Sequence, residues 1–318
     1  MPLVKKVFIA LIFFISFATL AISQNPIIRH LYTADPAARV FKDTLFVYTS
    51  HDEDTATWFN MLDWHVFSTV DMKKWTDHGA IFSLADLSWA SRAAWAPDCV
   101  YAHGLYYFYY PVETNAIGVA TAEHPAGKFR DALNKPLINR QTPGVVCSGY
   151  LIDPTVFIDD DSAAYLLFGM NDLNIVKLNK DMISFSDTVR QIKGADNFFE
   201  AVWMHKYKGK YYLSYSGQFS KEGRGKLLYA MSDSPYGPFE YKGVLLEEMN
   251  SGTNHHSIVS YKNQWYLFYH NSDLYFKNHP DEQPVLNWKG KNPFRRSVCF
   301  DLLQYNDDGT IRQVVPTK

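Results

Sequence analysis

The chain has 318 residues and a nearly balanced charge, with 31 Lys and Arg against 33 Asp and Glu. No basic patch indicates nucleic-acid binding, and no Ser/Gly tract or charge block divides the chain into separate domains. Its three cysteines, Cys99, Cys147 and Cys299, are too few and too odd in number for a disulfide framework. One large domain is therefore the simplest organisation, and an aromatic content of 16% fits both broad strands and sugar binding.

The N-terminus has the pattern of a cleavable signal peptide over residues 1–23. Lys5 and Lys6 precede an apolar run, and the small-residue pattern Ala21-Ile-Ser23 stands before Gln24. A membrane anchor is the alternative, but the run is shorter than the roughly 20 residues that span a bilayer. We therefore expect a periplasmic or secreted protein with no membrane attachment after cleavage, in which residues 24–318 form the single mature domain.

After this segment an aromatic strand recurs five times behind a short turn. The first residues of the five strands lie 47 to 62 residues apart. The strands are Leu45–Tyr48, Tyr107–Tyr110, Tyr165–Phe168, Tyr212–Tyr215 and Tyr266–Tyr269. Repeats of this period, built from short strands, are typical of propellers. The sequence predicts an all-β fold, a five-bladed β-propeller with almost no helix.

Pro/Gly turns follow the strands and are themselves repeated. Pro125-Ala-Gly-Lys-Phe129 in the second unit matches Pro235-Tyr-Gly-Pro-Phe239 in the fourth. Such turns between short apolar strands favour antiparallel pairing within each unit.

A polar residue stands nine to twelve positions before each aromatic strand. These residues are Asp35, Asp98, Asp153, Glu200 and His255. Because the innermost strands of a propeller start at one mouth of the central channel, the five side chains are expected to converge there. For a single Asp or His, a strand-end residue bonded to backbone is the simpler interpretation. Three carboxylates and a His at equivalent positions weaken it.

Asp35, Asp153 and Glu200 each lie among apolar residues. Burial raises the pKa of a carboxyl group, and neighbouring carboxylates push each other's pKa values apart. Glycoside hydrolysis needs that difference, because one protonated carboxyl donates to the leaving oxygen while an ionised one activates water or attacks.

At this point the sequence resembles glycoside hydrolase family 43, whose members are five-bladed β-propellers, over nearly the whole mature chain. The motifs that carry the resemblance are Ala34-Asp-Pro36, Trp95-Ala-Pro-Asp98, Ile152-Asp-Pro-Thr155, Glu200-Ala-Val-Trp-Met204, Asn254-His-His-Ser257 and Asp308-Gly-Thr-Ile311. The family inverts anomeric configuration. The resemblance implies Asp35 as general base, Glu200 as general acid and Asp153 as the residue that orients Glu200 and modulates its pKa. Inversion implies about 6.5 to 9.5 Å between the base and acid carboxyl groups.

The resemblance also implies a surrounding set of substrate-binding residues. Trp95 is expected to line the sugar pocket, with core packing as the alternative. Arg296, rather than Arg295, is expected to bind sugar hydroxyls or to hold a carboxylate ionised. No cofactor is required for the chemistry.

Many family members place a His near a calcium ion on the propeller axis. His255 takes that position here, where it is also expected to contribute to substrate binding. It would hold such an ion through water, because calcium prefers oxygen ligands, or it would hydrogen-bond the acid pair. The adjacent His256 is expected to point into the blade, although these two roles could be reversed.

Three further features have simpler interpretations. Asp98 is expected to be structural, and the acidic run Asp159, Asp160 and Asp161 to be a solvated turn. Ser162 stands where the family often has Gly, which bears on the geometry of that turn.

The predicted activity is exo α-L-arabinofuranosidase on plant polysaccharide or oligosaccharide side chains. Many of the family's xylosidases have a second β-sandwich domain, and the end of this chain at Lys318 favours an arabinofuranosidase. β-Xylosidase, endo-arabinanase and galactofuranosidase activities stay open, as does a non-catalytic carbohydrate-binding propeller. Arabinose- or xylose-containing glycans are the expected partners of a monomeric protein.

Overall fold

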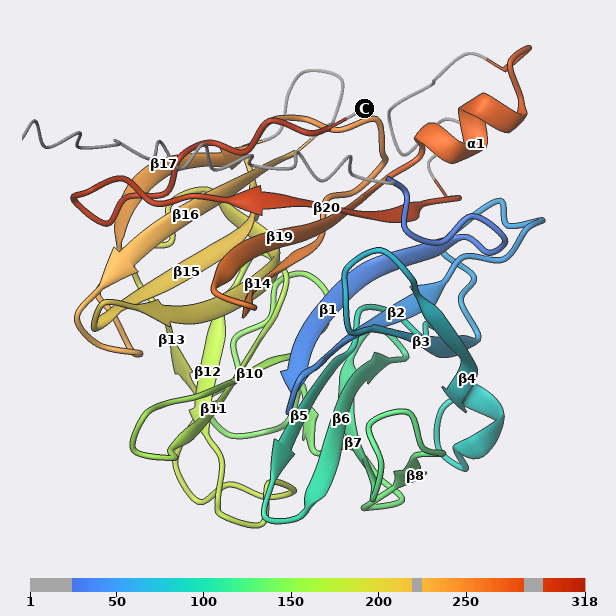
Figure 1. Cartoon of the computed structure of the whole chain (residues 1–318). Helices are drawn as coiled ribbons and strands as arrows, with labels where there is room; N and C mark the ends of the chain where they lie inside the picture. Colours follow the sequence, from blue (N-terminus) through green and yellow to red (C-terminus); the bar gives the residue numbers. More distant parts are fainter. Residues whose placement is uncertain (1–24, 219–224, 283–293, 318) are drawn as a thin grey trace, which may run out of the picture.

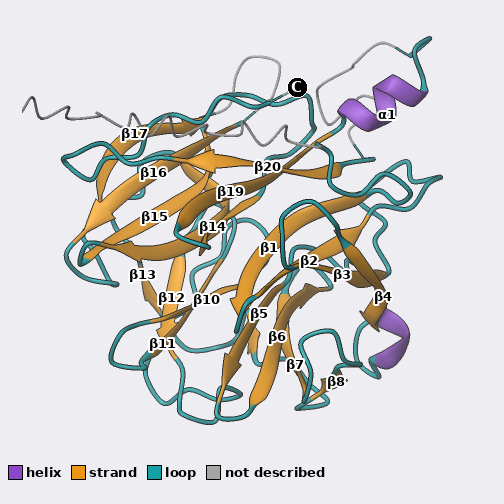
Figure 2. Cartoon of the chain, in the orientation of Figure 1, coloured by secondary structure: helices purple, strands orange, loops and turns teal. Residues whose placement is uncertain are grey.

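A computed structural model describes residues 25–218, 225–282 and 294–317. The predicted signal peptide lies outside these residues. The prediction of an all-β five-bladed propeller is confirmed: five antiparallel sheets surround a central axis, as Figures 1 and 2 show. The helical segments within this part of the chain are a 3-10 turn at Leu84–Asp86 and the short helix α1 at Asp273–Asn278.

Each blade pairs its strands in chain order from the axis outward. Blade 1 contains β1 (Thr33–Phe41), β2 (Thr44–His51), β3 (Asp63–Thr69) and β4 (Thr76–Ser83). Blade 2 contains β5 (Asp98–Ala102), β6 (Leu105–Val112), β7 (Ala116–Ala122) and β8 (Arg130–Asp131), with β9 (Ile138–Asn139) paired to β7. Blade 3 contains β10 (Thr155–Ile158), β11 (Ala164–Phe168), β12 (Asn174–Lys177) and β13 (Arg190–Gln191). Blade 4 contains β14 (Phe198–Tyr207), β15 (Lys210–Gly217), β16 (Lys226–Ser232) and β17 (Glu240–Leu246). Blade 5 contains β18 (His256–Tyr261), β19 (Gln264–Asn271) and β20 (Ser297–Leu303).

The recurring aromatic strands are the second strands of the blades, β2, β6, β11, β15 and β19. Their rings pack between neighbouring sheets. Phe108 and Tyr110 of β6 in blade 2, for example, contact Trp64 of β3 in blade 1 at ring-centroid distances of 5.6 and 5.3 Å. All three side chains are fully buried. The aromatic repeat is therefore the packing layer between blades.

The repeated Pro/Gly turns join adjacent blades. After the first turn, the backbone N–H of Phe129 donates to the carbonyl of Ile81 in β4 of blade 1. After the second, the N–H of Phe239 donates to the carbonyl of Lys193, just beyond β13 of blade 3. The repeated turn thus links blade 2 to blade 1 and blade 4 to blade 3 through equivalent backbone hydrogen bonds.

The ring is closed at blade 5 by the N-terminal segment of the described chain. The innermost strands contact one another in the circular order β1, β5, β10, β14 and β18, and β18 returns to β1. Asn25 exchanges hydrogen bonds with the backbone of Phe300, and the N–H of Ile27 donates to the carbonyl of Val298. Residues 25–27 therefore cover the outer edge of β20, which blunts an otherwise open sheet edge.

The cysteines are free: Cys99 and Cys299 are buried and Cys147 is partly exposed. In the ranges that the structure describes, no helix combines the length and the apolar character needed to cross a bilayer.

Candidate active site

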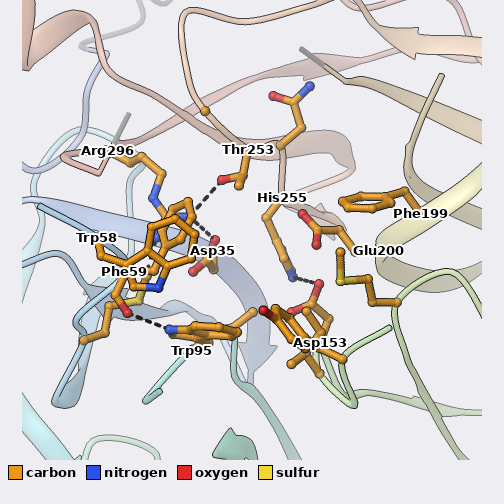
Figure 3. Close-up of a pocket in the computed structure, with 17 residues that line it drawn as sticks. Asp35, Trp58, Phe59, Trp95, Asp153, Phe199, Glu200, Thr253, His255 and Arg296 are labelled. Carbon is orange, nitrogen blue, oxygen red and sulfur yellow. Dashed lines mark hydrogen bonds and ion pairs between the residues drawn. The ribbon is translucent and has the colours of Figure 1, made fainter. Parts of the chain in front are cut away.

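A cavity of about 520 Å³ lies at the mouth of the channel where the innermost strands begin. Its walls come from all five blades, and Figure 3 shows Asp35, Asp153, Glu200 and His255 around it with the aromatic residues Trp58, Phe59 and Trp95. The lining residues are Asp35, Trp58, Phe59, Met61, Trp95, Ala96, Tyr150, Ile152, Asp153, Met170, Phe199, Glu200, Gly252, Thr253, Asn254, His255 and Arg296. The cavity therefore brings together every residue for which the sequence predicted a catalytic or substrate-binding role.

Local irregularities of the backbone aim the three carboxylates. Asp35 has a φ of 55° and lies where the β1–β2 register shifts, and Asp153 has a φ of 56° just before β10. Glu200 lies between two register shifts of the β14–β15 pair, next to Ala201 with a φ of 59°. Bulges of this kind redirect a side chain out of the regular alternation. Asp35 and Glu200 thus leave their strands toward the channel mouth, and Asp153 reaches it from the residues just before β10.

Asp35 is buried against positive charge and hydrogen-bond donors. Its Oδ1 lies 2.8 Å from Nη1 of Arg296, and its Oδ2 accepts a hydrogen bond from the Ser50 hydroxyl. Burial acts to raise the pKa of Asp35, but the charge of Arg296, together with the neighbouring histidines and the Ser50 hydrogen bond, outweighs it, so the pKa lies below its ordinary value. Asp35 is therefore an ionised carboxylate at neutral pH.

Arg296 is only 2% exposed and is fixed on both sides of its guanidinium. Its Nε and Nη2 donate to the two carboxylate oxygens of Asp52 at 2.9 and 2.8 Å, and its Nη1 also reaches Thr253 Oγ1 at 3.0 Å. This fork leaves Nη1 directed at Asp35. Arg295 lies outside the cavity and donates through Nε to the carbonyl of Asp54 at 2.6 Å.

Glu200 has the opposite electrostatic environment. Burial, followed by the negative charges of Asp153 and Asp35, raises its pKa well above the ordinary value. Burial also raises the pKa of Asp153 to about 6, although His255 acts against it. Asp153 Oδ2 accepts a hydrogen bond from the N–H of Ala201 at 2.8 Å, which holds it beside the Glu200 backbone. The site therefore combines an ionised Asp35 with a protonated Glu200, the pair that an acid and base mechanism needs.

The influence of Asp153 on Glu200 gives a pH prediction. Because the Asp153 charge raises the pKa of Glu200, Asp153→Asn is expected to lower that pKa, so that Glu200 loses its proton at a lower pH. The alkaline limb of the kcat/KM profile should then move to lower pH, with a smaller maximum. Asp172→Asn, a change in a partly exposed loop of blade 3, is the control and should leave the profile in place. An alkaline limb that stays at its wild-type position in Asp153→Asn would remove Asp153 from this role.

Trp95 lines the cavity with its ring while its polar edge is bound elsewhere. Its Nε1 donates to the carbonyl of Phe59 at 2.9 Å, and its ring centroid lies 5.9 Å from that of Tyr150. The structure also separates the adjacent histidines. His255 lines the cavity, with Nε2 at 3.9 Å from Asp153 Oδ2, whereas His256 is fully buried and bonded to Ser214 Oγ at 2.6 Å.

Asp98 departs from the pattern of converging polar residues. It does not line the cavity, and its carboxylate pairs with Arg39 and accepts from the N–H of Val156 at 2.7 Å. Asp98 therefore joins blades 1, 2 and 3 around the axis, as its expected structural role requires. The other four equivalent residues all line the cavity, and Trp95 takes the place of Asp98 as the contribution of blade 2.

The acidic turn before β11 is less solvated than expected. Asp160 is exposed, but the Asp159 side chain is only 9% exposed and pairs with Lys206 Nζ of blade 4 at 2.7 Å. The expectation of a solvated turn is wrong for Asp159, because a neighbouring blade supplies the cation. Ser162 has a φ of 67°, the left-handed conformation that favours Gly at this position.

Several cavity residues carry no repeat signal in the sequence. Trp58, Phe59 and Met61 come from the loop between β2 and β3, and Thr253 precedes β18. The adjacent aromatic residues Trp58 and Phe59 are the feature of this loop's sequence that indicates a pocket wall. Asp52, the partner of Arg296, is 244 residues away from it in the chain, and no local pattern identifies that pair.

Comparison with known proteins places this site in a family. The model for glycosyl hydrolases family 43 matches residues 23–311. A xylosidase/arabinosidase from Humicola insolens is 36% identical over an alignment that covers 78% of this chain and 90% of that protein. A solved α-L-arabinofuranosidase from Clostridium thermocellum is 44% identical with a TM-score of 0.76, covering 92% of this chain and 96% of that one. A β-xylosidase/α-arabinofuranosidase from a compost metagenome, solved with xylotriose in a calcium-free form, is 34% identical with a TM-score of 0.78, covering 91% and 96%. The chain therefore belongs to glycosyl hydrolase family 43, a family of inverting glycosidases.

Proposed function

We propose that this protein is an exported, exo-acting α-L-arabinofuranosidase that removes arabinofuranosyl residues from the side chains of plant polysaccharides. The observation that carries the proposal is the pairing of an ionised Asp35 with a protonated Glu200 in one aromatic cavity. The choice of sugar is supported by the solved relative at 44% identity, which is an α-L-arabinofuranosidase.

In the proposed reaction Glu200 is the general acid. Its raised pKa keeps the carboxyl protonated at neutral pH, so it can transfer its proton to the glycosidic oxygen as the bond to the anomeric carbon breaks. The leaving group departs as a neutral alcohol, and Glu200 becomes a carboxylate. Asp153 supports this role because its charge stabilises the protonated form of Glu200.

Asp35 is the general base on the opposite face of the sugar. Its carboxylate takes a proton from a water molecule as that water attacks the anomeric carbon, so the new bond forms with inverted configuration. Arg296 and Ser50 hold Asp35 in place and keep its pKa low enough for it to be ionised. Before the next turnover Asp35 releases the proton that it took from water to the solvent, and Glu200 takes up a proton from the solvent.

β-Xylosidase activity is the second candidate. Relatives at 34 to 36% identity are named for both xylosidase and arabinosidase activities, and one was solved with xylotriose. Trp58, Trp95 and Tyr150 give the cavity flat apolar walls, a surface that suits the faces of either pentose. A bifunctional enzyme with arabinofuranoside as the better substrate is consistent with these relatives.

We also propose that a calcium ion binds on the propeller axis beside His255. Both ring nitrogens of His255 are buried and lack a hydrogen-bond partner among the described residues, which fits a bound water or hydrated ion beside the ring. His255 would hold calcium through water, since calcium prefers oxygen ligands. The ion would supply positive charge near the carboxylates. His255 itself orients that water and stabilises the Asp153 charge.

The activity is tested with nitrophenyl α-L-arabinofuranoside, β-D-xyloside and β-D-galactofuranoside, each with and without a chelator. The arabinofuranoside should be hydrolysed fastest and the xyloside second, and a chelator should lower the rate if calcium acts on the axis. Preference for the galactofuranoside would overturn the choice of sugar. Binding of arabinan or xylan fragments without hydrolysis of any glycan would favour the non-catalytic propeller.

Export is proposed from residues 1–23, which resemble a signal peptide. N-terminal sequencing of the native protein from the periplasm or medium should begin at Gln24. A protein that retains Met1 in the cytoplasm would contradict this proposal.

A further inference from the structure

Blade 1 has a second group of titratable side chains that does not line the cavity. His51 Nδ1 lies 2.8 Å from Asp63 Oδ1, and His65 Nε2 lies 3.5 Å from the same oxygen. Glu53 Oε1 lies 3.9 Å from His51 Nδ1. Among the described residues, His51, Asp63 and His65 form the one group of three such side chains whose ligand atoms all lie within 4.8 Å of one another.

These distances are close to those of a tetrahedral metal site. Zinc binds His nitrogen and carboxylate oxygen at about 2.0 to 2.2 Å, so neighbouring ligand atoms around it lie about 3.3 Å apart. The His51–Asp63 separation of 2.8 Å and the His65–Asp63 separation of 3.5 Å lie on either side of this value. We propose that His51, Asp63 and His65 bind a divalent transition metal of the zinc class, with Glu53 or water as the fourth ligand.

The donor set selects the class of metal. Two imidazoles with one carboxylate suit zinc and its transition-metal neighbours, whereas calcium takes oxygen ligands. The side chains of the three residues are 13 to 25% exposed, so an ion from solution can reach them without unfolding of the blade. Nδ1 of His65 is buried without a hydrogen-bond partner among the described residues, so the ring can hold its proton there and offer the lone pair of Nε2 to the metal.

The proposed metal site lies at the base of a loop that forms part of the cavity wall. His51 is the last residue of β2 and Asp63 is the first residue of β3, so a shared metal would tie together the two ends of the loop 52–62. That loop carries Trp58, Phe59 and Met61 of the cavity wall, and Asp52 at its start holds Arg296. Metal binding would therefore restrict the loop at its base.

The test uses zinc chloride and the full-length mature protein, without a polyhistidine tag and stripped of metal by a chelator. Isothermal titration should give one zinc ion per chain, and cobalt at the same site should give the visible absorption of a four-coordinate ion. His65→Gln and Asp63→Asn should each weaken zinc binding by at least about tenfold. His30→Gln is the matched control. His30 forms a similar 2.8 Å pair with Asp77 but belongs to no group of three ligands among the described residues, so zinc binding by this variant should be unchanged.

Limited proteolysis provides a second readout that needs neither glycoside hydrolysis nor calorimetry. Chymotrypsin is expected to cleave after exposed Trp58 or Leu62, and zinc should slow this cleavage in the wild type but not in His65→Gln. Equal zinc binding by wild type and a folded His65→Gln variant would overturn the proposal, as would the absence of zinc binding by the wild type. If Asp63→Asn fails to fold, the His65→Gln comparison alone decides. Because no glycoside is used, failure of the arabinofuranosidase assignment would leave this result intact.

Discussion

Glu200→Gln is expected to reduce turnover of a natural arabinoxylan oligosaccharide by about 10²- to 10⁴-fold, the usual contribution of a general acid. Gln has nearly the shape of protonated Glu but has no acidic proton to give to the leaving oxygen. The loss should be much smaller for nitrophenyl α-L-arabinofuranoside, because nitrophenolate departs without protonation. Steady-state kinetics on both substrates measure the difference.

Glu240→Gln is the control for this change. Glu240 is an exposed residue of β17 that pairs with Lys242, so its substitution should leave both rates unaltered. An equal loss on both substrates in Glu200→Gln would indicate damage to the site rather than loss of an acid. Unaltered hydrolysis of the natural oligosaccharide by Glu200→Gln would refute the assignment of Glu200 as the acid.

Asp35→Asn is expected to reduce turnover by a similar factor of about 10² to 10⁴, but equally for both substrates. The missing step is removal of a proton from water, which does not depend on the leaving group. Arg296 keeps its two contacts with Asp52, so the substitution should not leave that buried charge unpaired. Kinetics on the same two substrates, with thermal unfolding as a check of stability, distinguish this pattern from that of Glu200→Gln.

Asp301→Asn is the matched control for a buried aspartate outside the cavity. Asp301 accepts hydrogen bonds from the Tyr269 hydroxyl at 2.7 Å and from the N–H of Thr317 at 3.1 Å, and the single amide oxygen of Asn can keep the first of them. Turnover by Asp301→Asn should stay near the wild-type rate. A loss in Asp35→Asn that depended strongly on the leaving group would contradict its role as base.

The fold was predictable because its determinants repeat along the chain. Each aromatic second strand is preceded by an innermost strand, so the period located the blades and the starts of their inner strands. His256, the first residue of β18, is buried in the blade, while its neighbour His255, just before the strand, lines the cavity, as expected for adjacent residues of extended chain. The period of the repeat is visible in the sequence without knowledge of tertiary contacts.

The remainder of the site depends on contacts between distant segments. Asp98 begins β5 but its carboxylate turns to Arg39, because a cation from blade 1 and a backbone N–H from blade 3 lie beside it. Asp52 and Thr253 hold Arg296 from two separate loops. Loop conformation is set by such packing, and no periodic signal in the sequence encodes it.

The separation of the Asp35 and Glu200 carboxyl groups stays a prediction of about 6.5 to 9.5 Å, the distance at which water fits between base and sugar. The chemical consequence of that space is the configuration of the first product. Proton NMR during the first minutes of hydrolysis of an α-L-arabinofuranoside measures it before the free sugar equilibrates. An inverting enzyme should release β-L-arabinofuranose first, and the α anomer should follow by mutarotation. Initial release of the α anomer, or no hydrolysis of the arabinofuranoside, would contradict it.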